Sequence, residues 1–414
     1  MDNFTVTIEK LVHGGQGLAT LPDGRKVFVW NALPGEVAKV RIIKKRRDYV
    51  EAVAEDVLEP STERTTPKEE IYLSTSPWQI MTFEVENKYK KEIINEVFAR
   101  EHVVLPDYRF TTPSHEYHYR NKMEYSFWGD DYGIHLALHK RGSHGKQIVV
   151  GSALALPSVD NGANQVLKEL QKHNIRAGDL KTVIVRANQT GEAAASLFVK
   201  NQDFIKLALP SNLNGLAVYY SNPKSPASVP TKLMYKLGDT TIQDTLLGKS
   251  FEYNSDSFFQ VNLPIFEQAL SVIKKFVYEN EVVDMYGGVG SIGLGVSNNP
   301  TIIELDDATA KMAIHNTKDS DAKVIQASSE KALDYIIKDK ILIVDPPRAG
   351  LHKNVINRIL HTKPKKVIYL SCNPATQARD IKLLESNYLV SFFEGYNFFP
   401  RTPHIETLAV MELV

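Results

Sequence analysis

The single cysteine of the sequence lies where a reactive group could act. Cys372 stands in the run Ser371-Cys372-Asn373-Pro374, directly after an apolar stretch that predicts a β-strand at 367–370. One thiol excludes intrachain disulfides and any zinc or iron–sulfur site built from several cysteines. An isolated cysteine is more often a small buried hydrophobic residue. Here, however, proline ends the strand, and ligands of α/β sheets bind at strand ends, so the position favours a ligand site.

Two carboxylates stand at comparable positions. The predicted strand 341–344 runs into Asp345-Pro346-Pro347-Arg348, and two prolines cannot extend a hydrogen-bonded ladder, so they fix a rigid turn. Glu406 precedes the last predicted strand, 407–411, among apolar neighbours. A buried carboxylate is costly there unless it is paired or takes part in chemistry. Both acids are therefore expected near the thiol.

A glycine-rich turn indicates a nucleoside ligand. Residues 284–291 join a predicted strand to a helix through Gly287, Gly288 and Gly290, and glycine lets the backbone approach a ligand closely. Such a turn is weak evidence by itself, because it can be only a tight connection. The next strand, however, ends at Glu304, where a carboxylate can bind both hydroxyls of a ribose. No Gly-x-x-x-x-Gly-Lys-Ser/Thr motif is present, so S-adenosylmethionine fits better than a nucleoside triphosphate.

The elements that position these groups alternate between strand and helix. Amphipathic helices, for instance at 307–317 and 376–386, lie between apolar runs that predict strands at 281–285, 301–305, 323–326, 341–344, 367–370, 389–393 and 407–411. This alternation predicts a Rossmann-like α/β domain, whose parallel, doubly wound sheet is covered by helices on both faces. We assign this domain to residues 251–414.

The first part of the chain predicts a small β-barrel. Short β-rich runs and glycine turns in residues 1–60 are typical of a five-stranded, OB-like barrel, and the polar segment 60–67 predicts a linker. Residues 39–47 carry six basic side chains and are followed by Tyr49. This run is either a strand edge protected by charge or a surface that contacts RNA phosphates. In the second interpretation the contacts come from Lys44, Lys45, Arg46 and Arg47.

The middle of the chain, residues 61–250, predicts a mixed α+β domain. Its β-like runs surround a predicted helix at 161–173, and a second helix at 84–101 has the apolar spacing to pack on the C-terminal domain.

Composition limits the class of protein. The 414 residues include 49 basic and 49 acidic side chains, so a nucleic-acid partner has to be bound by local patches. The length predicts two or three domains. Because no apolar stretch approaches the ~18 residues of a membrane span and the N-terminus lacks the layout of a signal peptide, we expect a cytoplasmic protein without membrane contact. We also expect a monomer.

The strand-end motifs resemble, in order and spacing, those of the RNA 5-methyluridine methyltransferases. The first domain, with His13-Gly14-Gly15-Gln16-Gly17, is similar to the TRAM domain of many members. The other motifs that carry the resemblance are Ser257-Phe258-Phe259-Gln260-Val261-Asn262, Asp284-x-Tyr286-x-Gly288-x-Gly290, Asp345-Pro-Pro-Arg348, Ser371-Cys372-Asn373-Pro374 and Phe399-Pro-x-Thr402-x-His404-x-Glu406.

The resemblance implies a reaction and a set of site residues. Cys372 would add to C6 of a uracil, and Glu406 would remove the proton from C5 after methylation. Arg348 and the central α+β domain, residues 61–250, would contact the RNA. The TRAM domain favours 23S ribosomal RNA as the substrate, with transfer RNA as the alternative, because the simplest transfer-RNA enzymes of the family lack it. The implied cofactor is S-adenosyl-L-methionine, bound by Gln260, Tyr286, Gly288, Gly290, Glu304 and Asp345.

The sequence departs from the family in two places. Many members ligate an iron–sulfur cluster with four cysteines, three of which follow the TRAM domain, whereas residues 71–78 contain none here. No cluster is therefore expected. A residue that is often aspartate in the family, two positions before the Phe399-Pro400 motif, is Asn397 here, which alters the expected hydrogen bonding around Glu406.

Three alternatives were weighed against this interpretation. A 5-methylcytidine methyltransferase would use two cysteines, and an exocyclic-amine methyltransferase usually carries Pro-Pro-Tyr or Pro-Pro-Phe in place of Asp345-Pro-Pro-Arg348. A non-catalytic RNA-binding protein would share the barrel and the basic run. The presence of Cys372, Glu406 and the cofactor residues favours the enzyme.

Overall fold

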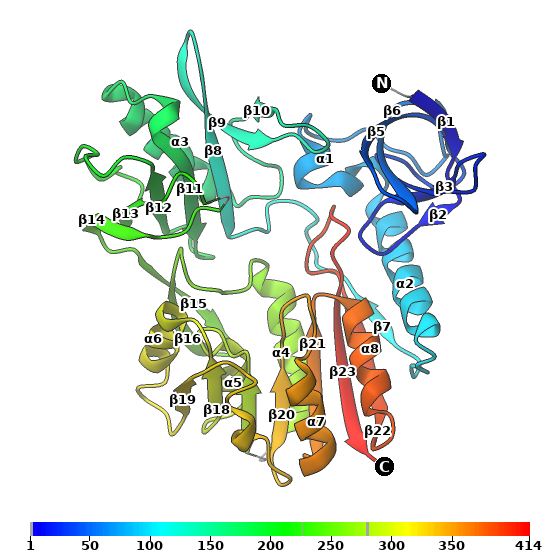
Figure 1. The fold of residues 1–414 in the computed structure, drawn as a ribbon. Helices are drawn as coiled ribbons and strands as arrows, with labels where there is room; N and C mark the ends of the chain where they lie inside the picture. Colours follow the sequence, from blue (N-terminus) through cyan, green and yellow to red (C-terminus); the bar gives the residue numbers. More distant parts are fainter. Residues whose placement is uncertain (1–2, 226, 279–280) are drawn as a thin grey trace.

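The computed structural model describes residues 3–225, 227–278 and 281–414. Figure 1 shows three parts: an N-terminal barrel, a central sheet with one long helix against it, and a C-terminal sheet flanked by helices. No helix in the described ranges is long and apolar enough to cross a membrane.

The N-terminal part is a six-stranded sheet with the order β1-β5-β6-β4-β3-β2. Its core consists of the alternating apolar side chains of each strand, such as Val27 and Val29. We predicted five strands; the structure adds one because β2, two residues long, is too short to show alternation. The strands are β1 Asn3–Thr7, β2 Lys10–Leu11, β3 Gly17–Thr20, β4 Lys26–Trp30, β5 Val37–Lys45 and β6 Tyr49–Glu59.

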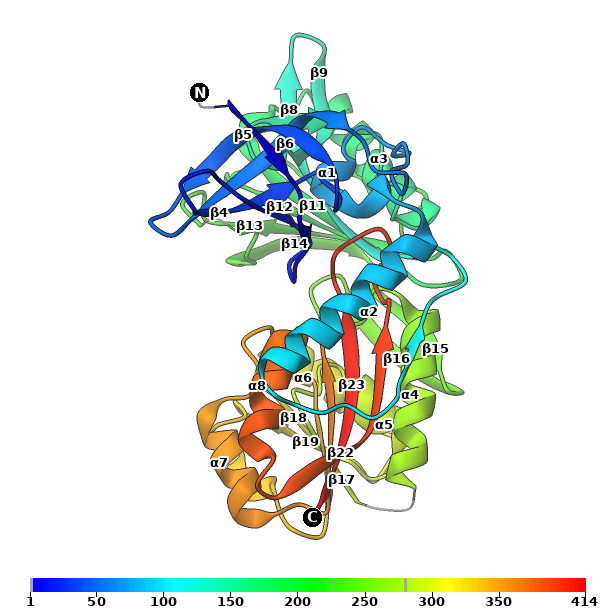
Figure 2. The ribbon, with the colours of Figure 1, turned by 90° about the vertical axis from the view of Figure 1, so that its right-hand side faces the viewer.

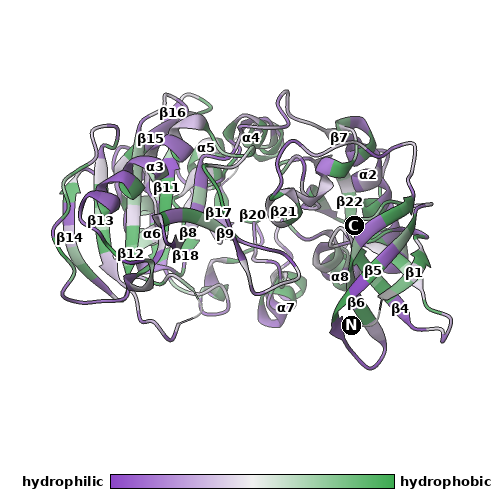
Figure 3. Ribbon diagram, turned by 90° about the horizontal axis from the view of Figure 1, so that it is seen from above, coloured by the Kyte–Doolittle hydropathy of each residue, from purple (hydrophilic) through white to green (hydrophobic). Residues whose placement is uncertain are grey.

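The central part is a seven-stranded sheet with the order β10-β9-β8-β11-β12-β13-β14, and helix α3 (Pro157–Lys172) packs on it. Viewed from above, its strands carry both hydrophobic and hydrophilic segments, and the connecting loops are mostly hydrophilic (Figure 3). The strands are β8 Lys122–Asp130, β9 Gly133–His139, β10 Lys146–Ile148, β11 Leu180–Ala187, β12 Ala193–Val199, β13 Gly215–Tyr220 and β14 Lys232–Gly238, and the hairpin β15 Thr241–Leu246 with β16 Lys249–Asn254 leads to the C-terminal part.

The C-terminal part is an eight-stranded sheet with the order β19-β18-β17-β20-β21-β23-β22-β7. The first five strands are parallel, as predicted, but β23 runs antiparallel to both β21 and β22. The expectation of a wholly parallel sheet was therefore wrong at its end, because a short loop joins β22 to β23 and leaves no crossover. The strands are β17 Val282–Met285, β18 Thr301–Glu304, β19 Lys323–Gln326, β20 Ile341–Val344, β21 Lys366–Ser371, β22 Tyr388–Tyr396 and β23 Glu406–Leu413.

Segments from the first half of the chain complete this sheet. Strand β7 (Arg109–Thr111) pairs with β22 at the sheet edge, and helix α2 (Phe83–Arg100) packs on α8 (Pro374–Leu384) (Figure 2). Ile93 and Phe98 of α2 are buried in the same hydrophobic core as Ile381 and Leu384 of α8. The other helices are α1 Tyr72–Thr75, α4 Leu263–Val277, α5 Ser291–Val296, α6 Asp307–Asn316 and α7 Lys353–Thr362, with 3₁₀ turns η1 Pro77–Ile80, η2 Ala177–Asp179 and η3 Leu333–Tyr335.

Candidate active site

The thiol and the predicted acids lie along one edge of the C-terminal sheet. Asp345 directly follows β20, Cys372 directly follows β21, and Glu406 begins β23. Because β23 is antiparallel to β21, with Ser371 opposite Thr407 in the register, its first residue lies at the same edge as the carboxyl ends of the parallel strands. Sheet topology therefore brings together side chains that are distant in the sequence.

A cavity of about 570 Å³ contains most of the predicted site. Gly290 does not line it; this glycine caps the start of α5 with a φ of 88°. The residues of the predicted set that do line it are Gln260, Tyr286, Gly288, Glu304, Asp345, Arg348, Cys372 and Glu406.

The glycine turn has positive φ angles both at a glycine, as the sequence pattern predicts, and at a residue that is not glycine. Gly288 has a φ of 57°, a left-handed conformation that glycine adopts without strain. Its N–H donates to Oε2 of Glu304 at 2.9 Å, which ties the turn to the end of β18. Tyr286 also has a positive φ, 69°, although it is not glycine. Such outliers often occur at ligand sites.

Burial of the carboxyl groups favours their neutral forms. The pKa values of Asp345 and of the neighbouring Asp284 are both raised to about 7, mainly by desolvation. Desolvation and the nearby Asp345 raise the pKa of Glu406 well above its usual range. Within the described part of the chain, Oε2 of Glu406 has no hydrogen-bond partner. A buried carboxyl group with a raised pKa and a free oxygen is suited to accept or donate a proton.

The same surroundings act on the thiol. Desolvation, followed by the charges of Glu406 and Asp345, raises the pKa of Cys372 to about 12, and Arg348 opposes this shift. Cys372 is therefore protonated at neutral pH.

This shift predicts a pH dependence of alkylation. Only the thiolate reacts, so the rate of iodoacetamide labelling of Cys372 should rise about tenfold per pH unit between about pH 7 and 10 without levelling off. Glu406→Gln should speed labelling, because the charge of Glu406 contributes to the raised pKa of the thiol. Mass spectrometry of the modified peptide measures both rates, and a plateau by about pH 9 would contradict the raised pKa.

A second cavity, of about 820 Å³, lies where the three parts of the protein meet over Cys372. Cys372 and Arg348 line both cavities. The other cationic side chains that line it are Arg120, Lys122 and Arg141, and Glu124 is the acidic one. Concentrated positive charge beside a reactive thiol suits a polyanion such as RNA.

Comparison with known proteins gives this geometry a family. A family model described as tRNA (Uracil-5-)-methyltransferase matches residues 331–413, and a TRAM domain model matches residues 2–54. Proteins named as uncharacterized RNA methyltransferases are similar over nearly the whole chain. The one from Enterococcus faecalis is 28% identical, over 99% of this chain and 97% of its own, and the one from Thermotoga maritima is 26% identical, over 98% of each.

The chain is an RNA methyltransferase, and its residues 331–413 match the RNA uracil-5-methyltransferase family. This RNA methyltransferase carries an N-terminal TRAM domain. Its fold is shared with the tRNA (uracil-54, C5)-methyltransferase of Pyrococcus abyssi, solved with S-adenosyl-L-homocysteine, at a TM-score of 0.80 and 21% identity over 99% of this chain and 100% of that one.

Several residues of the methyltransferase site were not predicted from the sequence. His13 and Trp30 of the TRAM domain line the second cavity, and His404 lines both. The Nη2 of Arg348 lies 3.2 Å from Nδ1 of His404, and burial, with Arg348 second, lowers the pKa of His404 to about 3. His13 and His404 occur in the motifs that carry the family resemblance, which was the available signal; Trp30 had none.

The predicted RNA-binding residues of the TRAM domain lie elsewhere. Lys44, Lys45, Arg46 and Arg47 are exposed at the β5–β6 turn and line neither cavity. Lys44 forms an ion pair with Glu51 at 3.4 Å. They can contact RNA only outside the active site.

Segment 71–78 of the methyltransferase is held by hydrogen bonds to one carboxylate. Oε1 of Glu69 accepts from Oγ1 of Thr75 at 2.8 Å, Oγ of Ser76 at 3.0 Å and Nε2 of Gln79 at 3.2 Å. Its Oε2 accepts from the N–H of Ala153 in the central domain at 2.8 Å. Polar side chains thus join α1, η1 and the central domain.

Proposed function

We propose that this enzyme methylates C5 of a specific uridine in RNA through a covalent bond between Sγ of Cys372 and C6 of the uracil. The observation that carries the proposal is that the thiol, Glu406 and the cofactor residues line one cavity, and that the same thiol lines the basic cavity beside it. Cofactor and RNA can therefore approach Cys372 from different sides.

The side chains supply what uracil lacks. C5 is a weak nucleophile. Once the Cys372 thiol has released its proton to solvent, addition of the thiolate to C6 turns the ring into an enolate with electron density at C5. After C5 has been methylated, Glu406 accepts its remaining proton, the C5–C6 double bond re-forms and the thiolate leaves. In its ionised form, Glu406 is a stronger base than an exposed carboxylate, because its pKa is raised.

The residues of the first cavity fit the methyl donor. S-adenosyl-L-methionine supplies an electrophilic methyl group. Glu304 offers a carboxylate for ribose hydroxyls, and Tyr286 offers an aromatic surface. Gln260 and Asp345 provide polar groups for the amino-acid moiety. All four line the cavity.

A mechanism-based substrate tests the proposal. RNA with 5-fluorouridine at the target carries fluorine at C5 in place of the hydrogen that Glu406 removes as a proton. Elimination is therefore blocked, and the protein should remain attached in a complex that survives denaturation. The trapped RNA should be methylated only when S-adenosyl-L-methionine is present, and no complex should form with Cys372→Ala. Methylation of natural RNA without any trapped complex would contradict the covalent step.

Two RNAs are candidates for the substrate. We place 23S ribosomal RNA first because of the TRAM domain. Transfer RNA is supported by the Pyrococcus abyssi enzyme, which shares the fold over 99% of this chain and is named for uracil-54 of tRNA. Mapping 5-methyluridine in both RNAs from a strain that lacks the gene decides between them: the site that is lost identifies the substrate.

We further propose that Lys44, Lys45, Arg46 and Arg47 bind RNA outside the active site. Neutralising all four should weaken binding of long RNA and reduce its salt slope by up to about four, if each contacts a phosphate. A short hairpin that fills only the active site should be methylated almost normally. As the matched control, neutralising Arg120 and Lys122 of the second cavity should impair both RNAs. Unchanged affinity and salt slope for long RNA would contradict this role.

The protein should work without an iron–sulfur cluster. Its sequence contains one cysteine, and cysteine thiolates are what hold such clusters. We expect colourless, oxygen-insensitive protein with no stoichiometric iron by elemental analysis. A visible charge-transfer band accompanied by iron would contradict the expectation.

A further inference from the structure

The loop between β22 and β23 controls where Glu406 lies. This loop, Asn397–Ile405, leaves the sheet after Tyr396 and returns to it at Glu406, and Tyr396 and Glu406 are partners in the register. It also carries Phe399 and His404, which line the first cavity. The conformation of the loop therefore fixes three groups of the active site.

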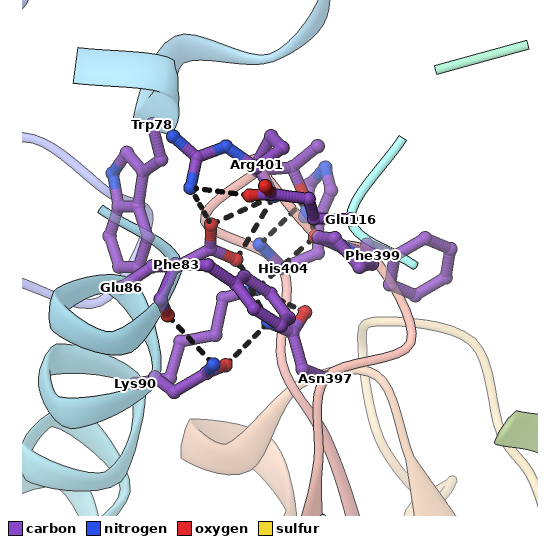
Figure 4. A network of polar contacts seen from close by, with 12 residues as sticks. Trp78, Phe83, Glu86, Lys90, Glu116, Asn397, Phe399, Arg401 and His404 are labelled. Atoms are coloured by element: carbon purple, nitrogen blue, oxygen red, sulfur yellow. Dashed lines mark hydrogen bonds and ion pairs between the residues drawn. The ribbon is translucent and has the colours of Figure 1, made fainter. Parts of the chain in front are cut away.

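Two charged residues of α2 hold this loop from below. Glu86 and Lys90 are fully buried and form an ion pair at 2.9 Å. Nζ of Lys90 donates to Oδ1 of Asn397 at 2.6 Å and to the carbonyl of Phe399 at 3.1 Å. The Glu86 carboxylate accepts from Nδ2 of Asn397 at 2.9 Å and from the backbone N–H of Arg401 at 2.9 and 3.0 Å (Figure 4). The first half of the loop, from Asn397 to Arg401, is thus fixed to one helix.

The loop needs this support because part of it is strained. Arg401 has a φ of 64°, a left-handed conformation that is unfavourable for a side chain other than glycine. Its backbone N–H donates a hydrogen bond to Glu86, and its Nη1 lies 3.3 Å from Oε2 of Glu86. A buried ion pair is in general a poor source of stability. Here the pair contacts the loop directly, which indicates a role in its geometry.

The buried charges are balanced around Asn397. Glu86 and Lys90 cancel one another, and Arg401 is 3.3 Å from the partly exposed Glu116. Asn397 is neutral and bridges the pair, because its Oδ1 faces Lys90 and its Nδ2 faces Glu86. A carboxylate at 397 in place of the amide would put two acids side by side, and one would have to take up a proton.

We propose that Glu86 and Lys90 are positioning residues for Glu406, and that the loop requires one buried carboxylate beside Lys90, supplied from position 86 or equally from position 397. The proposal deepens the proposed function, since it rests on Glu406 as the base. The proposal implies that the carboxylate at position 86 and the amide at position 397 can change places. In E86Q/N397D, the side-chain amide at 86 can donate to the carboxylate at 397, which still accepts from Lys90.

The experiment is a double-mutant cycle on the full-length enzyme. Glu86→Gln and Asn397→Asp should each lower kcat by about 10- to 100-fold with little change in the KM for S-adenosyl-L-methionine, because small displacements of reacting groups are costly and the cofactor residues lie on other strands. E86Q/N397D should recover to within about threefold of the parent. Glu116→Gln, which contacts Arg401 from its exposed side, is the matched control and should leave kcat unchanged.

A second readout separates positioning from folding. If the loop displaces Glu406, methylated adduct on natural RNA should accumulate in Glu86→Gln, whereas partial unfolding would lower adduct and turnover together. A kcat of the double variant no higher than that of Asn397→Asp would overturn the proposal, and this comparison holds even if Glu86→Gln alone does not fold. A wild-type kcat in Glu86→Gln would overturn it as well. If Glu406→Gln itself accumulates no adduct, the base is misassigned, while recovery of kcat in the double variant still tests the network.

Discussion

Cys372→Ala should abolish methylation and leave the binding of S-adenosyl-L-methionine nearly unchanged. The sulfur is the one nucleophile of the proposed reaction, and loss of a covalent nucleophile usually costs far more than 100-fold in kcat, so turnover should fall below ~1% of the parent. The cofactor residues lie on neighbouring strands and do not need the thiol for their positions. Transfer of a labelled methyl group to RNA and calorimetric titration with the cofactor measure the two quantities.

The matched control is Cys372→Ser, which keeps the size of the side chain but replaces the thiol with a far weaker nucleophile. It should bind RNA and cofactor like the parent and be as inactive as the alanine variant. Measurable methylation by Cys372→Ser, above ~1%, would show that C5 is methylated without sulfur addition.

Glu406→Gln should stop the reaction after methyl transfer. The amide cannot accept the C5 proton, so the adduct cannot eliminate. Protein–RNA complex that resists heat and denaturant should accumulate with natural RNA, up to one per active site, while kcat falls by about 10²- to 10⁴-fold. Gel electrophoresis under denaturing conditions measures the complex.

The control for this result is Glu406→Gln combined with Cys372→Ala, in which no complex should form. Normal turnover by Glu406→Gln without accumulated adduct would assign proton removal to another group. Asp345, with a pKa raised to about 7 in the same cavity, would be the next candidate.

Strand-end chemistry could be predicted from the sequence because it depends on local signals. Prolines after strands and one unpaired thiol marked Asp345 and Cys372, and the structure places both in one cavity with Glu406. The antiparallel course of β23 could not be predicted from alternation alone, since hydrophobic runs do not encode strand direction. We expected Asn397 to alter the hydrogen bonding around Glu406, but the sequence did not indicate its partners. The structure shows that it bonds to Glu86 and Lys90, two residues of a helix about three hundred positions earlier.

Contacts across domains were also beyond prediction. Trp30 enters the second cavity only because the barrel docks there: Nε1 of Trp78 donates to the carbonyl of Gly15 at 3.0 Å, and Gly15 lies against Pro403 with no room for a Cβ. Such long-range packing leaves no periodic trace in either segment. The alternation in 301–326 and 341–371, by contrast, predicted β18 to β21 closely, since buried parallel strands are continuous apolar runs.

The interleaving of α2 and β7 with the C-terminal sheet has a consequence for biosynthesis. Both segments leave the ribosome long before the strands that they pack against, and the whole central domain is made in between. Until β22 is synthesised, the edge of β7 and the apolar side of α2 have no native partner, and exposed strand edges and apolar faces favour aggregation. The catalytic domain of this enzyme therefore cannot mature as an independent unit from residue 251 onward. The domain is completed last, when its final strands pack against α2 and β7. Until then these two segments are exposed, and chaperones can be expected to bind the nascent chain.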